Sequence, residues 1–523
     1  MAMAEIQLPS RAVVPPISGE LTVMSPVDGT VIAAVPNMTD ADVAVLAARL
    51  RAAQPEWEAL GTRGRGKWLG QLRDWILDNE THLMSLIQQE TGKVYGDASI
   101  EPSYGLMVLN YWIKNAEEFL RDGRPKPASP TQLTKQLTVS YRPFPLVGVI
   151  SPWNWPLVMP LLDIPAALMA GCAVLSKPSE LTPLTWLEVV RGWREDIEAP
   201  DVLGCATGAG ATGRAVVDAV DMVQFTGSVR TGRAVAARAG ERLIPCSLEL
   251  GGKDPMIVLN DADIERTSAG AVWGAFVNAG QGCIAIERAY VEAGIYDDFV
   301  REVVSKTAAL RVGTDIDAPF TADIGAMSSE AQLAIVERHV DDAVAKGAKV
   351  LAGGKRRPGP GFYYLPTVLV DVDHTMDIMR EETFGPVLPI MKVPDAESAL
   401  ALANDSAFGL SGSVWTKDRR KGEALAERLE VGGVCVNNVC MTNFQLPLPS
   451  GGWKDSGIGA RFGAAGGIRK YTRAQARVSE RVEAKSEAHW YPFTPFKGGL
   501  IAKGSRFIEA RDWRRRLGRS AGR

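Results

Sequence analysis

Short apolar runs that alternate with helical segments dominate residues 145–260, and this pattern constrains the fold more than any other feature of the chain. The runs with the length and composition of buried strands are LVGVISP (146–152), CAVLSKPS (172–179), MVQFTGS (222–228) and PMIVLN (255–260). PLLDIPAALMAG (160–171) has the composition of a helix between the first two runs. Strands that alternate with helices predict doubly wound α/β units around a parallel sheet.

The segment before this region has a different pattern. Residues 40–60 and 64–120 carry apolar side chains at helical spacing, as at Trp68 and Leu72, and predict helices. The polar, proline-containing stretch 122–136 predicts an extended connector. The 523 residues are enough for two or three packed units.

The composition argues against several classes of function. With 58 Lys and Arg against 61 Asp and Glu, the net charge of −3 gives no reason to expect nucleic acid as a partner. The first residues lack the pattern of a secretory signal, and no stretch approaches the roughly 18 apolar residues that span a bilayer. Six cysteines without CxxC spacing predict a reducing, cytoplasmic setting. Four histidines without a close pair predict that there is no metal site.

One cysteine lies in a segment that suits nucleophilic catalysis. In NAGQGCIAIER (278–288), Cys283 stands between small residues that leave its sulfur approachable, and Gly280 and Gly282 allow backbone N–H groups to approach a bound oxygen. A buried structural cysteine is the commoner alternative, because a free thiol with a pKa near about 8.5 needs activation. The segment by itself leaves both interpretations open.

Two polar residues adjoin the ends of apolar strands. Glu249 in LELGGKDP (248–255) has apolar neighbours, and burial would raise its pKa towards neutrality and make it a usable general base. Asn154 in SPWNWPL (151–157) carries an amide donor that could stabilise an oxyanion. The structural alternatives are a carboxylate that caps a turn and an ordinary turn asparagine.

Glycine-rich turns that follow strands suit the phosphates of a nucleotide. FTGSVRTG (225–232) opens a helix, whose N–H groups and dipole favour a pyrophosphate. GAGATG (208–213) matches G-x-G-x-x-G, which is a weak signal by itself. SKPSE (176–180) offers Lys177 and Glu180 to ribose hydroxyls. Each segment could also be an ordinary turn.

Together these motifs follow the order found in the aldehyde dehydrogenase superfamily, which the chain resembles from about residue 20 to residue 475. The further motifs that agree are EETFGPV (381–387), GGVCVNN (432–438) and PSGGWKDSGIGARFG (449–463). The resemblance implies that Cys283 attacks an aldehyde, that Asn154 and the Cys283 backbone N–H hold the oxyanion, and that hydride passes to a nicotinamide. Glu249 would then activate the water that hydrolyses the thioester to a carboxylic acid.

The resemblance also implies a cofactor site. Its residues would be Trp153, Lys177, Glu180, Gly210, Gly213, Phe225, Ser228, Glu382 and Phe384. Lys177 and Glu180 would hold the adenosine ribose, and Ser228 would face the pyrophosphate. Glu382 would bond the nicotinamide ribose. Because the Glu180 carboxylate repels a 2′-phosphate, we expect NAD to be preferred, with NADP as the second cofactor.

The implied fold is α/β, with a Rossmann-like cofactor domain, an α/β catalytic domain and a small β oligomerisation arm. The expected division is a cofactor domain of residues 1–122 and 144–250, a catalytic domain of 251–465, an arm of 123–143 and about 466–485, and a basic C-terminal extension of 486–523. Because arms of this kind pair across subunits in the family, we expect a homodimer or homotetramer.

The C-terminal extension is first aromatic and then basic. In SRFIEARDWRRRLGR, Phe507, Ala510, Trp513 or Arg514, and Leu517 follow a roughly helical spacing, with arginines between them. Such a helix could lie on an anionic membrane surface. The commoner fates of a short basic terminal helix are packing on a neighbouring subunit and exposure to solvent.

The neighbours of the catalytic motifs predict the lining of a substrate tunnel. They are Trp155, Met159, Leu162, Val277 and Ile284. The set is apolar and has no Arg to bind a substrate carboxylate, which favours an aliphatic or aromatic aldehyde. The alternative substrate is succinic semialdehyde, because the GQGCIAIER context, LPLPSGG and the basic tail resemble a branch often labelled succinate-semialdehyde dehydrogenase. The retained Glu249 argues against a CoA-acylating enzyme, and the retained Cys283, Glu249 and Asn154 argue against a non-catalytic scaffold.

Overall fold

The computed structural model describes residues 19–129, 132–487 and 489–518, which belong to two compact units. The larger unit comprises Met1–Phe119 and Pro143–Tyr471, and the smaller one comprises Leu120–Arg142 and Thr472–Arg523. The larger unit begins with a hairpin and a run of helices: β1 (Glu20–Met24), β2 (Val31–Pro36), α1 (Asp40–Ala59), α2 (Gly61–Asp78), α3 (Glu80–Thr91) and α4 (Tyr95–Phe119).

The helical stretch expected over residues 64–120 is divided into separate helices. Asn79 ends α2, and Gly92 ends α3 with a φ of 73°. That left-handed conformation suits glycine, which has no Cβ to clash with the preceding turn. The apolar spacing therefore predicted helical structure correctly but could not show where the chain turns between helices.

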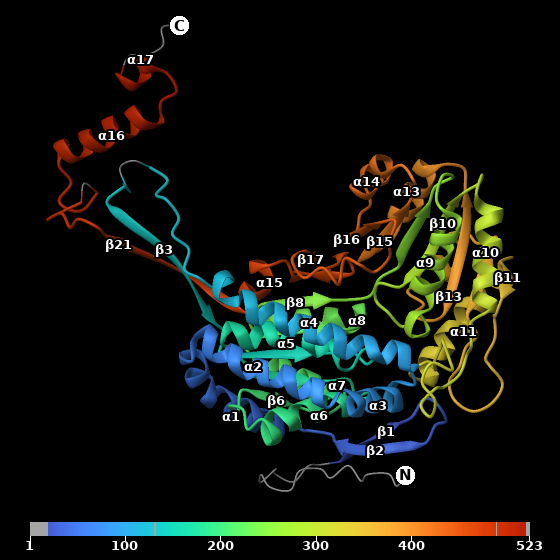
Figure 1. The fold of residues 1–523 in the computed structure, drawn as a ribbon. Coiled ribbons are helices and arrows are strands. Elements are labelled where there is room, and N and C mark those ends of the chain that lie inside the picture. The colour runs from blue at the N-terminus through green and yellow to red at the C-terminus, as the bar shows by residue number, and fades with distance from the viewer. Residues whose placement is uncertain (1–18, 130–131, 488, 519–523) are drawn as a thin grey trace. The chain divides into compact units, whose positions relative to one another are not determined.

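A largely parallel sheet with strand order β19-β8-β7-β4-β5-β6 forms one half of the larger unit (Figure 1). Its strands are β4 (Leu146–Ile150), β5 (Ala173–Lys177), β6 (Leu203–Cys205), β7 (Met222–Thr226), β8 (Cys246–Glu249) and β19 (Gly457–Ile458). β19 runs antiparallel to β8, and the other pairs are parallel. Every residue of β4, β5 and β7 is buried, as in strands covered on both faces. The α/β pattern of the sequence is confirmed.

Helices cover this sheet. Those that connect its strands are α5 (Val158–Ala170), α6 (Leu184–Arg191), the π-helical turn η2 (Gly192–Asp196), α7 (Gly210–Ala219) and α8 (Val229–Glu241). α1 and α7 pack together against β4 and β5, while α5 contacts the same strands and also packs on α2 and α4. The helices before the sheet in sequence are thus part of its packing, and α4 lies next to the segment that enters α5.

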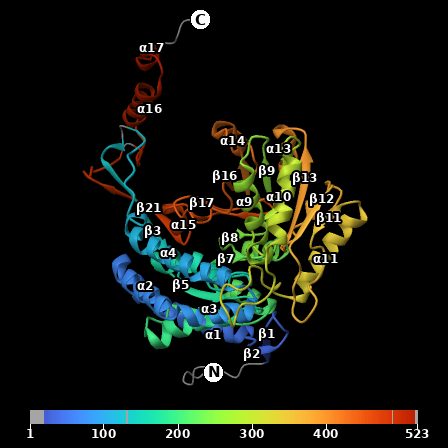
Figure 2. The same cartoon turned by 45° about the vertical axis from the view of Figure 1, so that its right-hand side comes forward.

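A second sheet, with order β11-β12-β13-β10-β9-β15-β16, forms the other half of the larger unit. Its strands are β9 (Asp254–Val258), β10 (Ile286–Glu292), β11 (Lys349–Ala352), β12 (Thr367–Val370), β13 (Val387–Val393), β15 (Ser411–Trp415) and β16 (Gly433–Val436). Its helices are α9 (Ile264–Phe276), the 3₁₀ turn η3 (Val277–Gly280), α10 (Tyr296–Ala308), α11 (Glu330–Ala345), α12 (Asp377–Arg380), α13 (Ala396–Asn404) and α14 (Arg419–Ala426). Figure 2 shows α9 and α10 beside this sheet.

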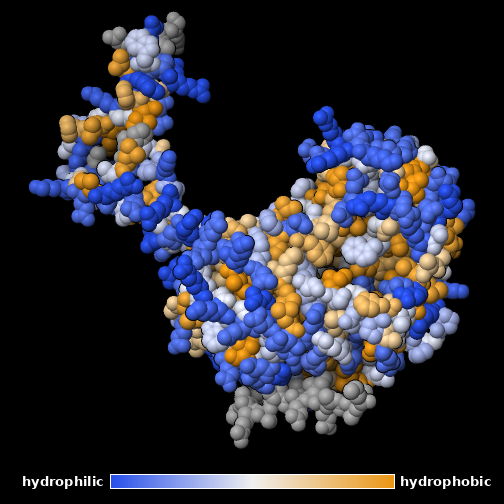
Figure 3. Space-filling view, viewed as in Figure 1, coloured by the Kyte–Doolittle hydropathy of each residue, from blue (hydrophilic) through white to orange (hydrophobic). Residues whose placement is uncertain are grey.

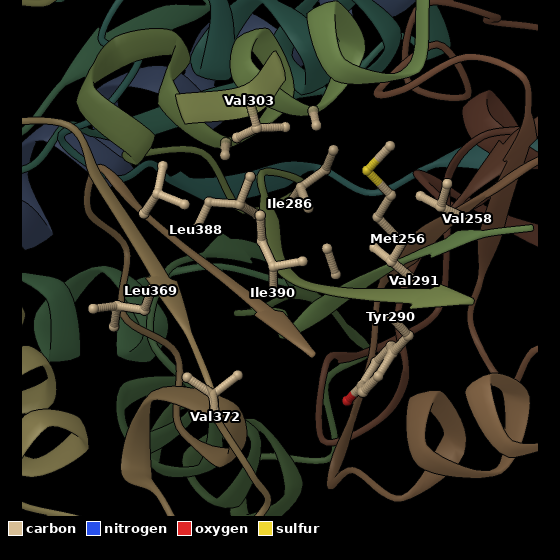
Figure 4. Packing of buried hydrophobic residues seen from close by; sticks show 14 of the residues in the cluster. Met256, Val258, Ile286, Tyr290, Val291, Val303, Leu369, Val372, Leu388 and Ile390 are labelled. Atoms are coloured by element: carbon tan, nitrogen blue, oxygen red, sulfur yellow. The ribbon is translucent and has the colours of Figure 1, made fainter. Parts of the chain in front are cut away.

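The core of the second half is formed by side chains from its central strands. Figure 4 shows Met256 and Val258 of β9 close to Ile286 and Val291 of β10, with Ile390 of β13 nearby. These side chains are at most 3% exposed. Since β10 begins three residues after Cys283, this packing also anchors the cysteine loop.

Short elements complete the larger unit, and strands and helices form the smaller one. The short elements are β14 (Phe408–Gly409), β17 (Pro449–Ser450), β18 (Trp453–Lys454), β20 (Arg461–Phe462) and α15 (Ala465–Arg469). The smaller unit contains β3 (Lys135–Pro143) paired with β21 (Thr472–Glu480), followed by α16 (Pro495–Glu509) and α17 (Trp513–Arg516). In the part of the chain that is described, no helix is long and apolar enough to cross a membrane.

The helical spacing expected from Phe507 to Leu517 is interrupted. α16 ends at Glu509, because Ala510 adopts an extended conformation with ψ of 132°. A new N-terminus follows, where the Asp512 side chain accepts a hydrogen bond from the Arg515 N–H at 2.8 Å. An aspartate in this position caps the N-terminus of a new helix, so α17 is a short helix separate from α16.

Candidate active site

The carboxyl ends of the parallel strands β4, β5, β7 and β8 carry most of the predicted site residues. Asn154 follows β4, Lys177 ends β5, Ser228 follows β7 and Glu249 ends β8. Parallel strands bring their carboxyl ends to one edge of a sheet, which is where ligands bind in α/β folds. Cys283 reaches the same edge from the loop between η3 and β10.

Cys283 is half-buried at the junction of two cavities. The loop before it is strained, since Asn278 and Ala279 have φ of 53° and 54°. Burial raises the pKa of the Cys283 thiol to about 12, although the positive charge of Arg461 opposes the shift. At neutral pH the sulfur is therefore a thiol that needs a base before it can act as a nucleophile.

Asn154 is held by contacts on both its backbone and its side chain. Its Nδ2 donates to the Gln281 carbonyl at 2.9 Å, and its own carbonyl accepts from Lys93 Nζ at 2.8 Å and Asn278 Nδ2 at 3.0 Å. Its Oδ1 is buried and has no hydrogen-bond partner among the described residues. Asn154 and Cys283 line the same cavity, of about 240 Å³.

Glu249 is a buried carboxyl at the end of β8. Its Oε1 has no partner within the described chain. Burial raises its pKa to about 7, while Arg461 and Lys470 oppose the shift. The carboxyl also interacts electrostatically with the Cys283 thiol. A carboxyl that titrates near neutrality within electrostatic range of a thiol is suited to accept and return protons.

A cavity of about 470 Å³ continues from this edge and contains the predicted residues for the adenosine end of a dinucleotide. It is lined by Trp153, Lys177, Glu180, Gly210, Gly213, Phe225 and Ser228. Ser228 caps α8, since its Oγ accepts from the Thr231 N–H at 3.3 Å. The N-terminus of this helix presents N–H groups and a positive dipole to the cavity, so the residues present fit a pyrophosphate.

The predicted nicotinamide end lies in the smaller cavity. Glu382 accepts a hydrogen bond from the Gly252 N–H at 2.9 Å, and a Cβ on Gly251 would lie 2.3 Å from the Glu382 carboxylate, so glycine is needed there. Phe384 contacts Trp153 edge to face, with ring centroids 5.4 Å apart. This cavity and the larger one share Trp153 and Ser228 in their walls, and together they form one elongated site that fits NAD(P).

An apolar cavity of about 90 Å³ leads away from Cys283 on the other side. All the predicted tunnel residues line it: Trp155, Met159, Leu162, Val277 and Ile284. It shares Ile100, Trp273 and Val277 with a larger outer cavity of about 530 Å³. A narrow apolar channel thus joins the thiol to a wider compartment.

Several residues that support the site were not predicted. Lys93 and Glu101 form a buried ion pair of 2.7 Å, and Arg461 binds Asp163 at 2.8 Å beside Glu249. Glu287 accepts from the Phe384 N–H at 2.8 Å and thereby holds the Glu382 loop. Glu287 and Arg461 lie inside motifs that the sequence singled out, but their roles depend on contacts with residues far along the chain. No cluster suited to a metal ion occurs among the described residues.

Comparisons with known proteins place the chain in one family. The profile of the aldehyde dehydrogenase family matches residues 14–476. A 4,4'-diapolycopene aldehyde oxidase of Methylomonas sp is 38% identical over 489 residues, which cover 92% of this chain and 90% of that protein. A protein of Mycolicibacterium smegmatis, provisionally named succinate-semialdehyde dehydrogenase [NADP(+)], is 40% identical over 458 residues, 87% of each chain.

Solved structures lead to the same class. A structure from Anabaena variabilis, described provisionally as an aldehyde dehydrogenase, has a TM-score of 0.86 at 36% identity and covers 91% of this chain and 100% of that one. The chain therefore belongs to the aldehyde dehydrogenase family. It is an NAD(P)-dependent oxidoreductase that converts an aldehyde to a carboxylic acid.

Proposed function

We propose that this enzyme oxidises apolar aliphatic or aromatic aldehydes through a thioester on Cys283. The observation that carries the proposal is the apolar cavity that ends at the Cys283 sulfur. In this proposal residues 1–122 and 144–250 bind the cofactor, residues 251–465 supply the nucleophile, and the arm joins subunits. The free state of the six cysteines supports a reducing, cytoplasmic location.

The buried polar groups have complementary roles in this proposal. Glu249 accepts the thiol proton as Cys283 Sγ bonds to the aldehyde carbon. The Asn154 amide and the Cys283 N–H stabilise the resulting oxyanion, and each such donor typically contributes about 2.7–4 kcal/mol. NAD(P), when bound, accepts the hydride that leaves this carbon. After Glu249 has released the thiol proton to solvent, it takes a proton from water while the water oxygen bonds to the thioester carbon. The C–S bond then breaks, and Glu249 returns this proton to the departing sulfur, which releases the acid and restores the thiol.

The cofactor preference rests on charges at the adenosine end of the cavity. Glu180 lies 3.5 Å from Lys177 and disfavours a 2′-phosphate, which supports NAD. Arg214 lines the same cavity, its nearest ion-pair partner being Asp40 at 3.9 Å, and it would favour NADP. We propose NAD as the preferred cofactor, because Glu180 pairs with the lysine proposed to bind the ribose, whereas the Arg214 side chain is the more exposed of the two, at 65% against 46%.

Succinic semialdehyde is the second candidate substrate, because of the name of the Mycolicibacterium relative. A semialdehyde carboxylate needs a cation, and no Lys or Arg is found among the described residues that line the inner cavity. Lys306 and Arg311 line the outer cavity, but they form ion pairs of 2.8 Å with Glu265 and Asp323. Because both cations are already paired with carboxylates, the cavities favour an apolar substrate over a semialdehyde carboxylate.

A steady-state assay that follows the absorbance of NADH or NADPH tests both parts of the proposal, the class of aldehyde and the preferred cofactor. We expect kcat/KM to be higher for hexanal and benzaldehyde than for succinic semialdehyde, and higher with NAD than with NADP. Cys283→Ala should abolish turnover, whereas Cys246→Ala, which removes a half-buried cysteine outside these cavities, should not. A preference for the semialdehyde above about 100-fold, near 2.7 kcal/mol, or a clear preference for NADP would overturn the corresponding part.

A further inference from the structure

The C-terminal extension, residues 486–523, carries a large excess of positive charge and lies beyond the region matched by the family profile. It contains nine Lys or Arg against three Asp or Glu, whereas the rest of the chain has 49 against 58. The three acidic residues can offset only three of these nine positive charges, so the extension keeps a net charge of +6. A surface of opposite charge is the natural partner for such a segment.

Helix α16 presents an apolar face to solvent. Phe496, Leu500 and Phe507 are spaced to lie on one side of the helix, and Ile501 and Ile508 extend that side. Phe496 is 79% exposed, and no side chain is buried in the described residues 489–518. Figure 3 shows orange hydrophobic residues interleaved with blue hydrophilic ones along this part of the chain. Further exposed aromatic side chains lie before the helix in sequence, at Trp490, Tyr491 and Phe493, and after it, at Trp513.

The sequence of α16 makes it a weak helix in isolation. Gly498, Gly499 and Gly504 lie inside it, and each glycine costs about 1 kcal/mol relative to alanine. Since no face of the helix is buried, this cost is not recovered by packing within the described chain. A helix with these properties is stabilised when its apolar face meets an external surface.

We propose that residues 489–518 dock on an anionic lipid surface. Phe496, Leu500 and Phe507 would enter the boundary between headgroups and acyl chains, and Trp and Tyr side chains favour that depth. The run Arg514–Arg516 follows Trp513 and would meet lipid phosphates. A nucleic acid would also attract the cations, but its binding would not explain the exposed apolar face of α16, so a lipid surface fits better. The competing partner is the acidic surface of a second copy of the chain. The experiment below distinguishes this partner from a lipid surface.

Co-sedimentation of the full-length enzyme with vesicles tests the proposal without relying on activity. We expect binding to phosphatidylcholine vesicles that contain about one quarter phosphatidylglycerol, and much weaker binding to phosphatidylcholine alone. The triple change of Arg514, Arg515 and Arg516 to Gln should weaken binding on the order of 100-fold, since each cation near an anionic surface contributes roughly a factor of five. The matched control changes Arg419, Arg420 and Lys421 of α14, also three exposed cations in a row, to Gln and should leave binding unchanged.

A second pair of variants tests the apolar face. Phe496→Ser with Phe507→Ser should reduce vesicle binding, whereas Leu243→Ser, at a side chain 93% exposed elsewhere, should not. Equal binding by wild type and the arginine variant, or no sedimentation with anionic vesicles, contradicts the proposal. If removal of residues 486–523 instead changes the oligomer size in gel filtration while vesicle binding is absent, the extension packs on a second copy.

Discussion

At the residue scale, burial changes Cys283 and Glu249 in ways that make each depend on the other. Desolvation raises the pKa of the thiol to about 12 and that of the carboxyl to about 7. Near neutral pH the thiol holds its proton, while about half of the Glu249 carboxyls are ionised. In the proposed mechanism the Glu249 carboxylate takes up the proton as sulfur attacks, so the titration of this carboxyl should control the rate.

Glu249→Gln is expected to lower kcat by about 10²–10⁴-fold, because general-base catalysis is lost. In the wild type, kcat should fall as the pH drops below about 7, where Glu249 becomes protonated. The residual rate of the variant should lack this dependence. A pH–rate profile of both proteins measures the effect, and an unchanged profile in the variant would assign the titration to another group.

The same carboxyl should affect stability with the opposite pH dependence. Because the pKa of Glu249 is raised in the folded state, its ionisation disfavours folding. The neutral carboxyl therefore adds to the free energy of unfolding at low pH, and this stabilisation is lost as the pH rises through about 7. Thermal melts of wild type and Glu249→Gln across this range provide the measurement. The difference in Tm should grow in favour of the variant as the pH rises.

At the scale of the element, α4 positions the loop that carries Asn154 through a buried ion pair. Glu101 on α4 binds Lys93 at 2.7 Å and accepts from the Leu157 N–H at 2.9 Å, at the entrance to α5. Lys93 in turn binds the Asn154 carbonyl and lies 3.8 Å from the centre of the Trp155 ring. The helix therefore holds the loop that carries both the proposed oxyanion donor, Asn154, and Trp155 in the wall of the inner cavity.

Glu101→Gln should destabilise the protein by about 3–5 kcal/mol, since it leaves Lys93 charged and unpaired in the interior. The double change Lys93→Met and Glu101→Leu should recover part of that stability. It should not recover kcat, because Lys93→Met removes the Lys93 donor to the Asn154 carbonyl and leaves only Asn278 Nδ2. Urea unfolding and steady-state kinetics give the two readouts. Full activity in the double variant would show that the ion pair does not position the loop.

Helix α9 forms a wall of the outer cavity and offers a test of substrate length. Ala269 is exposed and lines that cavity, so Ala269→Trp should narrow it. We expect kcat/KM to fall at least about tenfold for decanal and to stay within about twofold for propanal, because only the longer chain reaches beyond the inner cavity. Ala345→Trp on the exposed face of α11 is the control. An equal loss for both aldehydes would contradict this path.

At the scale of the whole molecule, the β3–β21 ribbon is a sheet with exposed edges. Nearly all of β21 is exposed, and Val478 within it is 64% exposed. Exposed strand edges and apolar side chains are stabilised when they pair with another chain. The prediction that follows is a homo-oligomer in which the arm contacts a neighbouring subunit.

Sedimentation velocity should therefore give a mass that is two or four times 56.3 kDa. Val478→Glu should shift the protein towards smaller species, because it places a charge on the arm strand. Val482→Glu lies just beyond β21 and is the matched control. If the wild type is a monomer, or if Val478→Glu leaves the assembly unchanged, the arm does not form the subunit interface.

The local pattern of the sequence determined the parallel strands and the residues at their carboxyl ends. Buried strands are continuous apolar runs, and the polar residue that follows such a run lies at the ligand-binding edge of the sheet, as Asn154 and Lys177 do. This reasoning depends on neighbours within a few residues. It also selected residues that line the inner apolar cavity, because Met159 and Leu162 lie on the helix that follows Asn154.

Only the tertiary structure decided how those residues are charged and supported. The pKa shifts of Cys283 and Glu249 arise from burial by segments far apart in the chain, and Arg461 reaches Asp163 across 298 residues of sequence. Hydrophobic periodicity reports which side of an element is covered but not which element covers it. For the same reason the ion pair of Lys93 and Glu101 and the uncovered face of α16 became visible only once the elements were packed.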